Sequence, residues 1–262
     1  MNPIGIFDSG VGGLTVFREI ARLLPHEPLI YLGDSARVPY GTKSRETVVR
    51  YSREAARFLL AREIKMLVVA CNTATAAALP ALQQELAIPV VGVIEPGARA
   101  AVEATRGNVG VIATEGTVKS KAYTRAIRAL QPNVRVLESA CPLFVPLAEE
   151  GWANTRVAQE VAEIYLDPLV DEGIDTLVLG CTHYPILRNT IQQVVGAAVS
   201  IVDSAETTAR AVRAELEARA LVAPADGKPK YQFLVTDAEE RFERIAGEFL
   251  DHSVDHLELV SL

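Results

Sequence analysis

Short apolar runs rich in β-branched residues alternate with segments of helical periodicity along this chain, and that alternation limits its possible folds more than any other feature. The runs are apolar throughout rather than at every second residue, which is typical of strands buried on both faces of a parallel sheet. Between the first two runs, Leu14, Phe17 and Ile20 fall on one helical stripe. We therefore predict a doubly wound α/β fold. Its predicted strands are residues 4–7, 29–32, 66–70, 90–94, 109–113, 134–137, 176–180 and 199–202.

The chain also carries an internal repeat. The stretch EIKMLVVACNTAT (63–75) aligns with GIDTLVLGCTHYP (173–185) at an offset of 110 positions, so that Cys71 meets Cys181. Upstream, GIFDSG (5–10) is echoed by GVIATE (110–115), and LIYLGDS (29–35) by VRVLESA (134–140), at an offset nearer 105. Three matches in the same order predict two similar doubly wound parallel-sheet domains, related by pseudo-two-fold symmetry, with the functional site in the cleft between them.

We place the boundary between these domains near residues 95–99, after the fourth predicted strand. The first domain then comprises residues 1–96 together with 207–262, and the second comprises residues 97–206. A stretch that contains Pro and Gly, 222–230, leads to a final strand–helix–strand unit at 231–262, which lies outside the repeat. We expect this unit to pack on the first domain.

Composition and charge exclude several classes of protein. The formal net charge is −7 and no basic stripe occurs, so we expect no nucleic-acid partner. No apolar run approaches the ~18 residues that span a membrane, and the N-terminal run, interrupted by Asp8, lacks the basic flank of a signal peptide. Three cysteines, an odd number, argue against a disulfide framework. We therefore expect a cytoplasmic protein with reduced thiols.

Two of the three cysteines occupy equivalent places in the repeat. Cys71 and Cys181 each follow a predicted strand, and ligands of doubly wound folds bind at the carboxyl ends of strands. Two thiols that face each other across a cleft suit a reaction that removes a Cα proton from one face of a substrate and returns a proton to the other. One thiol acts as base while the other acts as acid, and the roles exchange with direction. The pattern therefore indicates a two-base racemisation.

Each of these cysteines also precedes a predicted helix, at residues 72–78 and 185–195. A helix N-terminus lowers the pKa of a thiol and offers N–H groups to a carboxylate, so we expect both thiolates to be favoured. Two other interpretations stay open. Both cysteines could be core residues, or they could bind zinc with His183, although C-x-H is not a usual zinc pair and no C-x-x-C occurs. We expect no metal site and take Cys141 as structural.

Two turns contribute further candidate residues. The loop DSGVGG (8–13) follows the first predicted strand, and its glycines let backbone N–H groups approach an anion. A tight turn capped by Ser9 is the simpler interpretation. Asp8 suits a substrate ammonium group or a role in tuning a neighbouring thiol. The turn formed by Pro39, Tyr40 and Gly41 either lines the cleft or is an ordinary turn.

His183, two residues beyond Cys181, is a candidate partner of that thiol, which it could protonate or stabilise as a thiolate, or it could be structural. Glu149 and Glu150 follow an apolar run. Either of them could orient His183, or both could be solvated, and the sequence does not choose between them.

Four motifs resemble the motif set of glutamate racemases, in the family's order and over essentially the whole chain: DSGVGG (8–13), VPYG (38–41), ACNTA (70–74) and GCTHYP (180–185). The resemblance implies that Cys71 deprotonates D-glutamate and Cys181 deprotonates L-glutamate, with supporting roles for Asp8, His183 and Glu149. It also implies that no cofactor is needed, that the product D-glutamate serves peptidoglycan synthesis, and that the chain forms a homodimer. The substrate-binding residues that it implies are Asp8, Ser9, Pro39, Tyr40, Gly41, Asn72, Thr73, Thr117, Thr182 and His183.

The resemblance leaves other functions open. Aspartate and hydantoin racemases share the two-thiol plan, and selectivity for the side-chain carboxylate is not visible in the motifs. A catalytically silent module that binds an amino acid needs neither thiol, so the presence of both argues against it. A thiol–disulfide redox protein needs thiols that can approach bonding distance, which a substrate between them would prevent.

Overall fold

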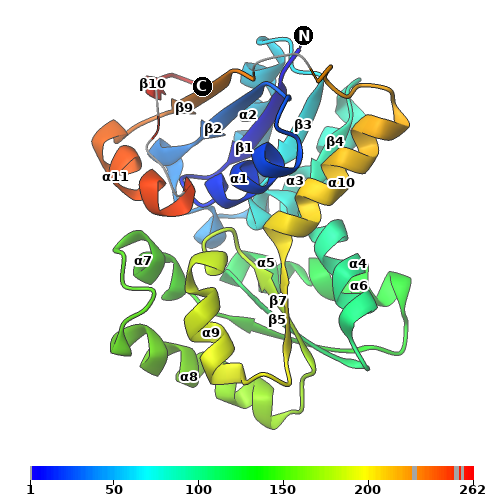
Figure 1. The fold of residues 1–262 in the computed structure, drawn as a ribbon, viewed down its shortest axis with the longest axis vertical. Helices are drawn as coiled ribbons and strands as arrows, with labels where there is room; N and C mark the ends of the chain where they lie inside the picture. Colours follow the sequence, from blue (N-terminus) through cyan, green and yellow to red (C-terminus); the bar gives the residue numbers. More distant parts are fainter. Residues whose placement is uncertain (1, 226–228, 251–253, 255–256) are drawn as a thin grey trace.

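Two parallel β-sheets form the frame of the protein, one in the upper half and one in the lower half of Figure 1. The computed structural model describes residues 2–225, 229–250, 254 and 257–262. The strands of the first sheet are β1 (Ile4–Asp8), β2 (Leu29–Gly33), β3 (Met66–Val69), β4 (Val90–Gly92), β9 (Tyr231–Val235) and β10 (Leu257–Leu259). Those of the second sheet are β5 (Asn108–Ala113), β6 (Arg135–Ala140), β7 (Thr176–Gly180) and β8 (Ser200–Asp203).

The two sheets share one strand order. The first runs β10-β9-β2-β1-β3-β4 and the second runs β6-β5-β7-β8, and all pairings between neighbours are parallel. In each, the first strand of the repeat lies between the second and the third, and the fourth lies beyond the third. The predicted fold class is therefore confirmed. The fourth predicted strand, 90–94, was too long, because β4 ends at Gly92 and a helix begins at Ile94.

Two glycines show how closely the halves correspond. Gly5 in β1 and Gly110 in β5 are equivalent in the repeat, and both lie under an isoleucine of the neighbouring segment. A Cβ on Gly5 would lie 2.8 Å from Cδ1 of Ile64, and a Cβ on Gly110 would lie 3.0 Å from Cδ1 of Ile174. Both halves therefore need a residue without a side chain at this place, so that the next segment can pack on the strand.

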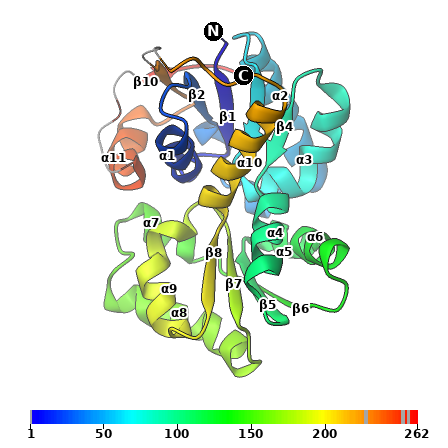
Figure 2. The same ribbon diagram turned by 45° about the vertical axis from the view of Figure 1, so that its right-hand side comes forward.

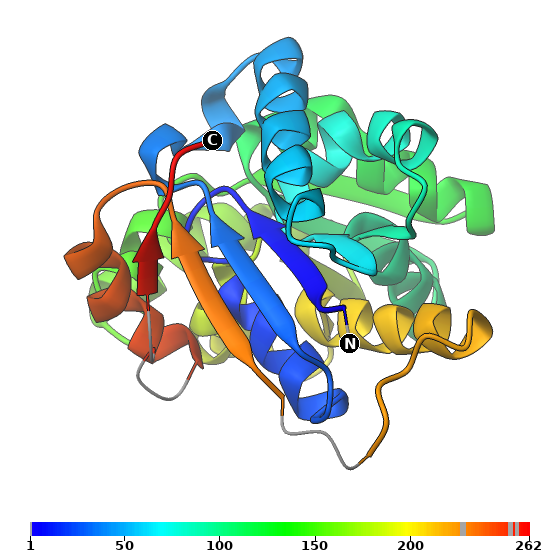
Figure 3. The same ribbon diagram turned by 90° about the horizontal axis from the view of Figure 1, so that it is seen from above.

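Helices cover both faces of each sheet, as the all-apolar strands require. On the first sheet, α1, α10 and α11 lie on one face and α2 and α3 lie on the other (Figure 3). On the second sheet, α8 and α9 pack together on one face and α4 and α6 on the other (Figure 2). The helices are α1 (Leu14–Leu23), α2 (Arg45–Leu60), α3 (Asn72–Glu85), α4 (Ile94–Ala104), α5 (Glu115–Ser120), α6 (Ala122–Leu130), α7 (Phe144–Glu149), α8 (Arg156–Asp171), α9 (Arg188–Val195), α10 (Ser204–Ala218) and α11 (Glu239–Leu250).

The chain passes from one sheet to the other twice, between β4 and α4 and again between β8 and α10. The predicted domain limits, 96/97 and 206/207, fall within the first turns of α4 and α10, and the division into domains stays a prediction. After α10, β9 adds to the first sheet beside β2, and α11 packs on α1. Residues 226–228 of the predicted 222–230 stretch, and 251–253 and 255–256 of the final unit, lie outside the described residues.

The described helices were also compared with the length and hydropathy of a membrane span. None of them is both long and apolar enough to cross a membrane.

Candidate active site

The carboxyl ends of the two sheets enclose a cavity of about 60 Å³. Cys71 follows β3 and Cys181 follows β7, and both lie in the wall of this cavity with 6% of each residue exposed. The structure thus brings together the two cysteines that the repeat placed at equivalent strand ends. The other predicted residues in the wall are Ser9, Pro39, Tyr40, Gly41, Asn72, Thr73, Glu149, Thr182 and His183.

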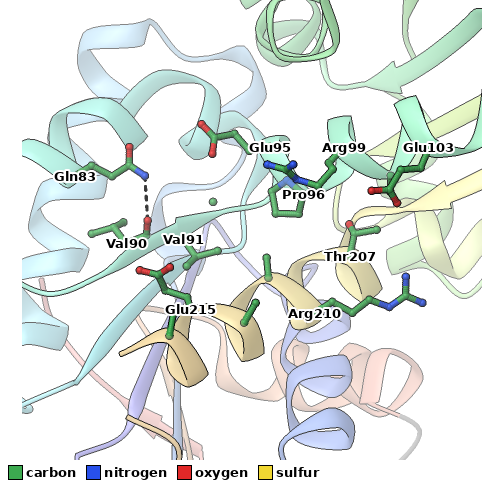
Figure 4. A pocket seen from close by; sticks show the side chains of 15 residues that line it. Gln83, Val90, Val91, Glu95, Pro96, Arg99, Glu103, Thr207, Arg210 and Glu215 are labelled. Carbon is green, nitrogen blue, oxygen red and sulfur yellow. Dashed lines mark hydrogen bonds between the residues drawn. The ribbon is translucent and has the colours of Figure 1, made fainter. Parts of the chain in front are cut away.

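A larger cavity of about 730 Å³ lies between α4 and α10 (Figure 4). Its wall carries Glu95 and Arg99 from α4 and Arg210 and Glu215 from α10 and, among the described residues, no cysteine or histidine. These charged groups can hold water or ions but do not form a pair of bases on opposite sides of a carbon atom. We therefore place the candidate active site at the smaller cavity, which holds both thiols.

Cys71 is the N-cap of α3. Its Sγ accepts a hydrogen bond from the N–H of Ala74 at 3.5 Å, as the predicted helix N-terminus requires. Burial nevertheless raises the pKa of Cys71 to about 12, and the nearby Asp8 carboxylate adds to the rise, while hydrogen bonds from Ser9 and Ala74 oppose it. The helix end therefore favours the thiolate of Cys71 as predicted, but desolvation by burial outweighs it in this structure.

The helix after Cys181 begins later than predicted. A 3₁₀ turn at Tyr184–Leu187 comes first, and α9 starts only at Arg188. The predicted helix start at residue 185 is therefore wrong, and Cys181 does not cap an α-helix as Cys71 does. A side chain takes the place of the helix end: Sγ of Cys181 lies 3.8 Å from Nδ1 of His183.

His183 links Cys181 to a carboxylate. Its Nε2 lies 3.0 Å from Oε1 of Glu149 on α7, whereas Glu150 is exposed, so Glu149 is the acid that faces the histidine. Burial alone would lower the pKa of His183, but its interactions with Cys181 and Glu149 raise that pKa to about 10. Interactions with His183 and Arg241 hold the pKa of Glu149 below its usual value against the effect of burial. Glu149 and His183 thus form a charged pair beside the Cys181 thiol.

The loop DSGVGG brings the two halves of the site into contact. A Cβ on Gly12 would clash with both Nδ1 of His183 and Oγ1 of Thr182, and a Cβ on Gly13 would lie 2.5 Å from Cβ of Asp8. The glycines therefore allow close packing of protein against protein. Ser9 does not cap α1, whose N-cap is Gly13 without a side-chain hydrogen bond; it lies in the cavity wall instead.

Asp8 ends β1 and is completely buried behind the cavity wall. Its Oδ2 accepts the N–H of Gly10 at 2.9 Å, and its Oδ1 has no hydrogen-bond partner among the described residues. Burial raises the pKa of Asp8, while the charge of His183 and backbone N–H groups oppose the rise. Because Asp8 acts electrostatically on both Cys71 and His183, its position favours a role in tuning the thiols over direct contact with a substrate ammonium group.

Three threonines join the two halves beside the cavity. Thr73 Oγ1 lies 2.9 Å from Thr114 Oγ1 and 3.4 Å from Thr117 Oγ1. Thr114 is part of the cavity wall, whereas Thr117, with 1% exposed, lies behind it. The structure therefore does not bring Thr117 to the wall, where the predicted substrate contact would require it; Thr117 reaches the wall only through Thr73 and Thr114.

The polar groups of two other predicted residues, Tyr40 and Asn72, differ in whether they are free to bind a ligand. The hydroxyl of Tyr40 donates to Oδ2 of Asp34 at 2.5 Å, so it is already engaged within the protein. Oδ1 of Asn72 accepts from the hydroxyl of Tyr123 at 2.7 Å, which fixes the amide and leaves Nδ2 without a partner among the described residues. An unpaired buried donor in a cavity wall is a candidate for binding a carboxylate.

Four residues in the wall were not predicted: Gly10, Val38, Thr114 and Val145. Gly10 and Val38 belong to motifs that were recognised, DSGVGG and VPYG. Thr114 could have been found from the repeat, because it corresponds to Ser9 at the offset of 105. Val145 comes from α7, which has no counterpart in the aligned stretches, so no sequence signal marked it.

The described residues contain no group of three or more His, Cys, Asp and Glu side chains that could hold a metal ion. Cys71, Cys181 and His183 therefore do not form the zinc site considered as an alternative. Two doubly wound sheets that hold a pair of thiols at the carboxyl ends of equivalent strands have the arrangement that an enzyme of two-base proton transfer requires.

Comparison with known proteins agrees with that class. Residues 4–212 match the Asp/Glu/Hydantoin racemase family, and the chain belongs to this family. It is 57% identical to a glutamate racemase of Geobacter metallireducens, over 99% of this chain and 96% of the relative. The family membership that the four motifs indicated is confirmed, and so is the predicted enzyme class, an amino-acid racemase.

Solved structures agree as closely. A glutamate racemase of Bacillus anthracis superposes with a TM-score of 0.96 at 44% identity, covering 100% of this chain and 98% of that one. A glutamate racemase of Francisella tularensis, solved in complex with D-glutamate, superposes with a TM-score of 0.93 at 39% identity, covering 99% and 97%.

Proposed function

We propose that this protein interconverts L-glutamate and D-glutamate by two-base proton transfer at Cα, without a cofactor. The observation that carries the proposal is the pair of cysteines, Cys71 and Cys181, in the wall of one cavity at equivalent ends of two sheets. The relatives that match this chain over nearly its whole length bear the name glutamate racemase, which favours glutamate over aspartate as the substrate.

In the proposed reaction, the thiolate of Cys71 removes the Cα proton of D-glutamate, and the thiol of Cys181 donates a proton to the opposite face. L-glutamate forms, and Cys181 is left as a thiolate. The reverse reaction starts from that state, with Cys181 as base and Cys71 as acid. The imidazolium of His183 stabilises the thiolate of Cys181, since Nδ1 lies 3.8 Å from Sγ. Glu149 holds His183 in its charged form.

We assign substrate binding to the polar groups that surround the thiols. The backbone N–H groups at the start of α3 and the free Nδ2 of Asn72 are suited to one carboxylate. Thr182 presents its hydroxyl from the opposite half, and its carbonyl is fixed by the hydroxyl of Thr15 at 3.0 Å. The remaining proposed contacts are Ser9, Thr73, His183 and the turn Pro39, Tyr40 and Gly41, with Asp8 and Thr117 acting from behind the wall.

Circular dichroism of the amino acid in solution tests the proposed activity. Purified protein in reducing buffer, with no added cofactor, is expected to abolish the signal of L-glutamate and to leave that of L-aspartate unchanged. Loss of the aspartate signal alone would replace glutamate by aspartate as the substrate. Persistence of both signals with an intact fold would contradict the proposed function and favour a module that only binds amino acids, which calorimetric titration with glutamate would detect.

The cellular role follows from the proposed product. We assign to the protein the supply of D-glutamate for peptidoglycan synthesis, in the cytoplasm. Expression in bacteria that depend on added D-glutamate tests this role, because growth without the supplement is expected with the unaltered protein and not with the Cys71→Ser variant. Growth with both proteins, or with neither, would contradict it.

We also propose two features of architecture. The first is the division into domains at residues 1–96 with 207–262 and at 97–206, which the two chain crossings support.

The second proposed feature is a homodimer. On α8, Val157 and Ile164 lie seven positions apart, hence on one face, and are exposed together with the nearby Trp152. Ile164, 72% exposed, is the most exposed of the three. Light scattering after gel filtration is expected to show a dimer that Ile164→Lys dissociates; a monomer before substitution would contradict it.

A further inference from the structure

Glu149 is held at both of its carboxylate oxygens. Oε1 lies 3.0 Å from Nε2 of His183, and Oε2 accepts a hydrogen bond from the guanidinium of Arg241 at 2.9 Å. The side chain of Glu149 is 20% exposed, so water reaches it. A carboxylate in such a place would rotate between rotamers if only one oxygen were bound. The second hydrogen bond removes that freedom and leaves Oε1 directed at the histidine.

Arg241 and Glu149 belong to different halves of the molecule. Arg241 lies on α11, which packs on α1 against the first sheet, whereas Glu149 lies at the end of α7, beside the second sheet. The two residues meet in the wall of a small cavity of about 70 Å³, which shares Gly10 and Val38 with the cavity that holds the thiols. The ion pair therefore joins the two halves of the molecule beside the candidate active site.

The same helix also contacts His183 directly. The ring of Phe249, near the end of α11, lies edge-on to the imidazole with 5.5 Å between ring centroids. Phe249 is fully buried, and the guanidinium of Arg18 donates to its carbonyl at 3.2 Å. The end of α11 that carries Phe249 therefore packs against the imidazole of His183. The other end, through Arg241, holds the carboxylate that is hydrogen-bonded to this imidazole.

We propose that Arg241 is a positioning residue for the Cys181 half of the reaction: it fixes Glu149, and Glu149 in turn holds the imidazole of His183 directed at the thiol. The proposal rests on the proposed roles of Cys181 and His183. Neither the composition nor the four motifs marked Arg241, which lies outside the repeat.

The contribution of this ion pair to stability should be small. The side chain of Arg241 is 56% exposed, and pairs so open to water are screened and add little to the free energy of unfolding. A loss of activity without a loss of stability would therefore identify a positioning role. The matched control is Arg244, which is also exposed and lies three residues further along the same helix.

When Arg241 is removed, the direction in which the pKa of His183 changes distinguishes a positioning role of Arg241 from a purely electrostatic one. The charged or titratable groups that face His183 are Cys181, Glu149 and Asp8, and Arg241 lies behind Glu149. Removing a cation while Glu149 stays in place would raise the pKa of the imidazole. Releasing Glu149 from its position would lower it, because the imidazolium then loses its nearest carboxylate.

The test uses the full-length protein labelled with ¹⁵N-histidine. Arg241→Gln, Arg241→Lys and the control Arg244→Gln are titrated by NMR, with the His183 signal assigned from its loss in His183→Gln. We expect the His183 midpoint in Arg241→Gln to fall by about one pH unit or more, with the high-pH limb of kcat/KM moving by the same amount. Arg241→Lys, which keeps the charge, should lie between Arg241→Gln and the unaltered protein, and Arg244→Gln should match the latter.

An unchanged or higher His183 midpoint in Arg241→Gln would overturn the proposal, whatever the activity of the variant. An equal fall in Arg244→Gln would also overturn it, because the effect would then belong to the charge of α11 in general. Failure of the proposed function itself would look different: the unaltered protein would not racemise glutamate, while the NMR midpoints would still report whether Arg241 controls His183.

Discussion

Sγ of Cys181 lies 3.8 Å from Nδ1 of His183, whereas the equivalent thiol, Cys71, accepts the N–H of Ala74 at its helix end at 3.5 Å. The two thiols occupy the same place in the repeat but have different partners. In the proposed reaction, each thiolate is therefore stabilised in a different way: that of Cys181 by a charged imidazole and that of Cys71 by a helix N-terminus.

Replacement of either thiol should stop racemisation. In Cys71→Ser or Cys181→Ser, the hydroxyl that replaces the thiol is a far weaker acid, so kcat/KM should fall by about 10³-fold or more. Polarimetry with L-glutamate and D-glutamate measures both directions. Cys141→Ser is the matched control, because Cys141 is also buried but does not line the cavity, and it should retain activity. Full activity in either of the first two variants would exclude the two-base mechanism.

Loss of His183 should affect one half-reaction more than the other. Because L-glutamate and D-glutamate have equal free energies, kcat/KM must fall equally in both directions, by about 10²-fold in His183→Asn. The asymmetry should instead appear in the primary isotope effect. This isotope effect should increase with [2-²H]-L-glutamate, whose Cα deuteron is removed by Cys181. It should decrease with [2-²H]-D-glutamate, whose Cα deuteron is removed by Cys71. Equal isotope effects that do not change on substitution would remove the assignment of His183 to Cys181.

The raised pKa of His183 should also make stability depend on pH. A group whose pKa is about 10 in the folded protein and about 6.5 when unfolded binds its proton more tightly in the folded state. Its contribution is fully present below pH 6.5 and is lost as the pH rises through 10. The melting temperature should therefore decrease between these values, and Glu149→Gln should make the decrease smaller. An equal decrease of the melting temperature with pH in Glu149→Gln and in the unaltered protein would contradict the link between the pKa of His183 and stability.

Much of the fold could be predicted, because the cause of each strand lies in its own residues. Apolar runs such as 176–180 can only be buried on both faces, and β7 occupies those residues. The equivalence of Cys71 and Cys181 was visible because the repeat preserved both the strand and the residue after it. Thr114 was missed although the repeat placed it opposite Ser9, since the hydroxyl is carried by a different residue type.

Other features depend on contacts that no local pattern records. The pKa of Cys71 is set by burial and by Asp8, which come from the packing of separate strands. The choice of Glu149 over Glu150 depends on which side of the end of α7 faces His183. Arg241 meets Glu149 from a helix 92 positions away in the sequence. Distances of this kind arise only when the two halves are assembled.

A buried ion pair outside the candidate active site, Lys65–Glu27, should contribute strongly to the free energy of unfolding. Nζ of Lys65 lies 2.5 Å from Oε2 of Glu27 and donates to the carbonyl of Leu221 at 2.7 Å, and Oε1 of Glu27 accepts the N–H of Ala223 at 2.6 Å. The pair thus ties the segment after α10 to the first sheet. Lys65→Met would leave a buried carboxylate unpaired and should lower the free energy of unfolding by about 3–5 kcal/mol. Urea denaturation measures this change, and a loss below about 1 kcal/mol, typical of an exposed pair, would contradict it.

The most direct test of the two-base account is the fate of deuterium during the first few per cent of conversion in D₂O. L-glutamate is incubated with the purified protein, and both enantiomers are recovered and analysed by mass spectrometry. The account predicts one deuterium at Cα in the D-glutamate formed and protium in the remaining L-glutamate, because the thiol that removes the proton is not the one that replaces it. The same deuterium content in both enantiomers from the start would show that one group serves both faces, and would contradict the roles of Cys71 and Cys181.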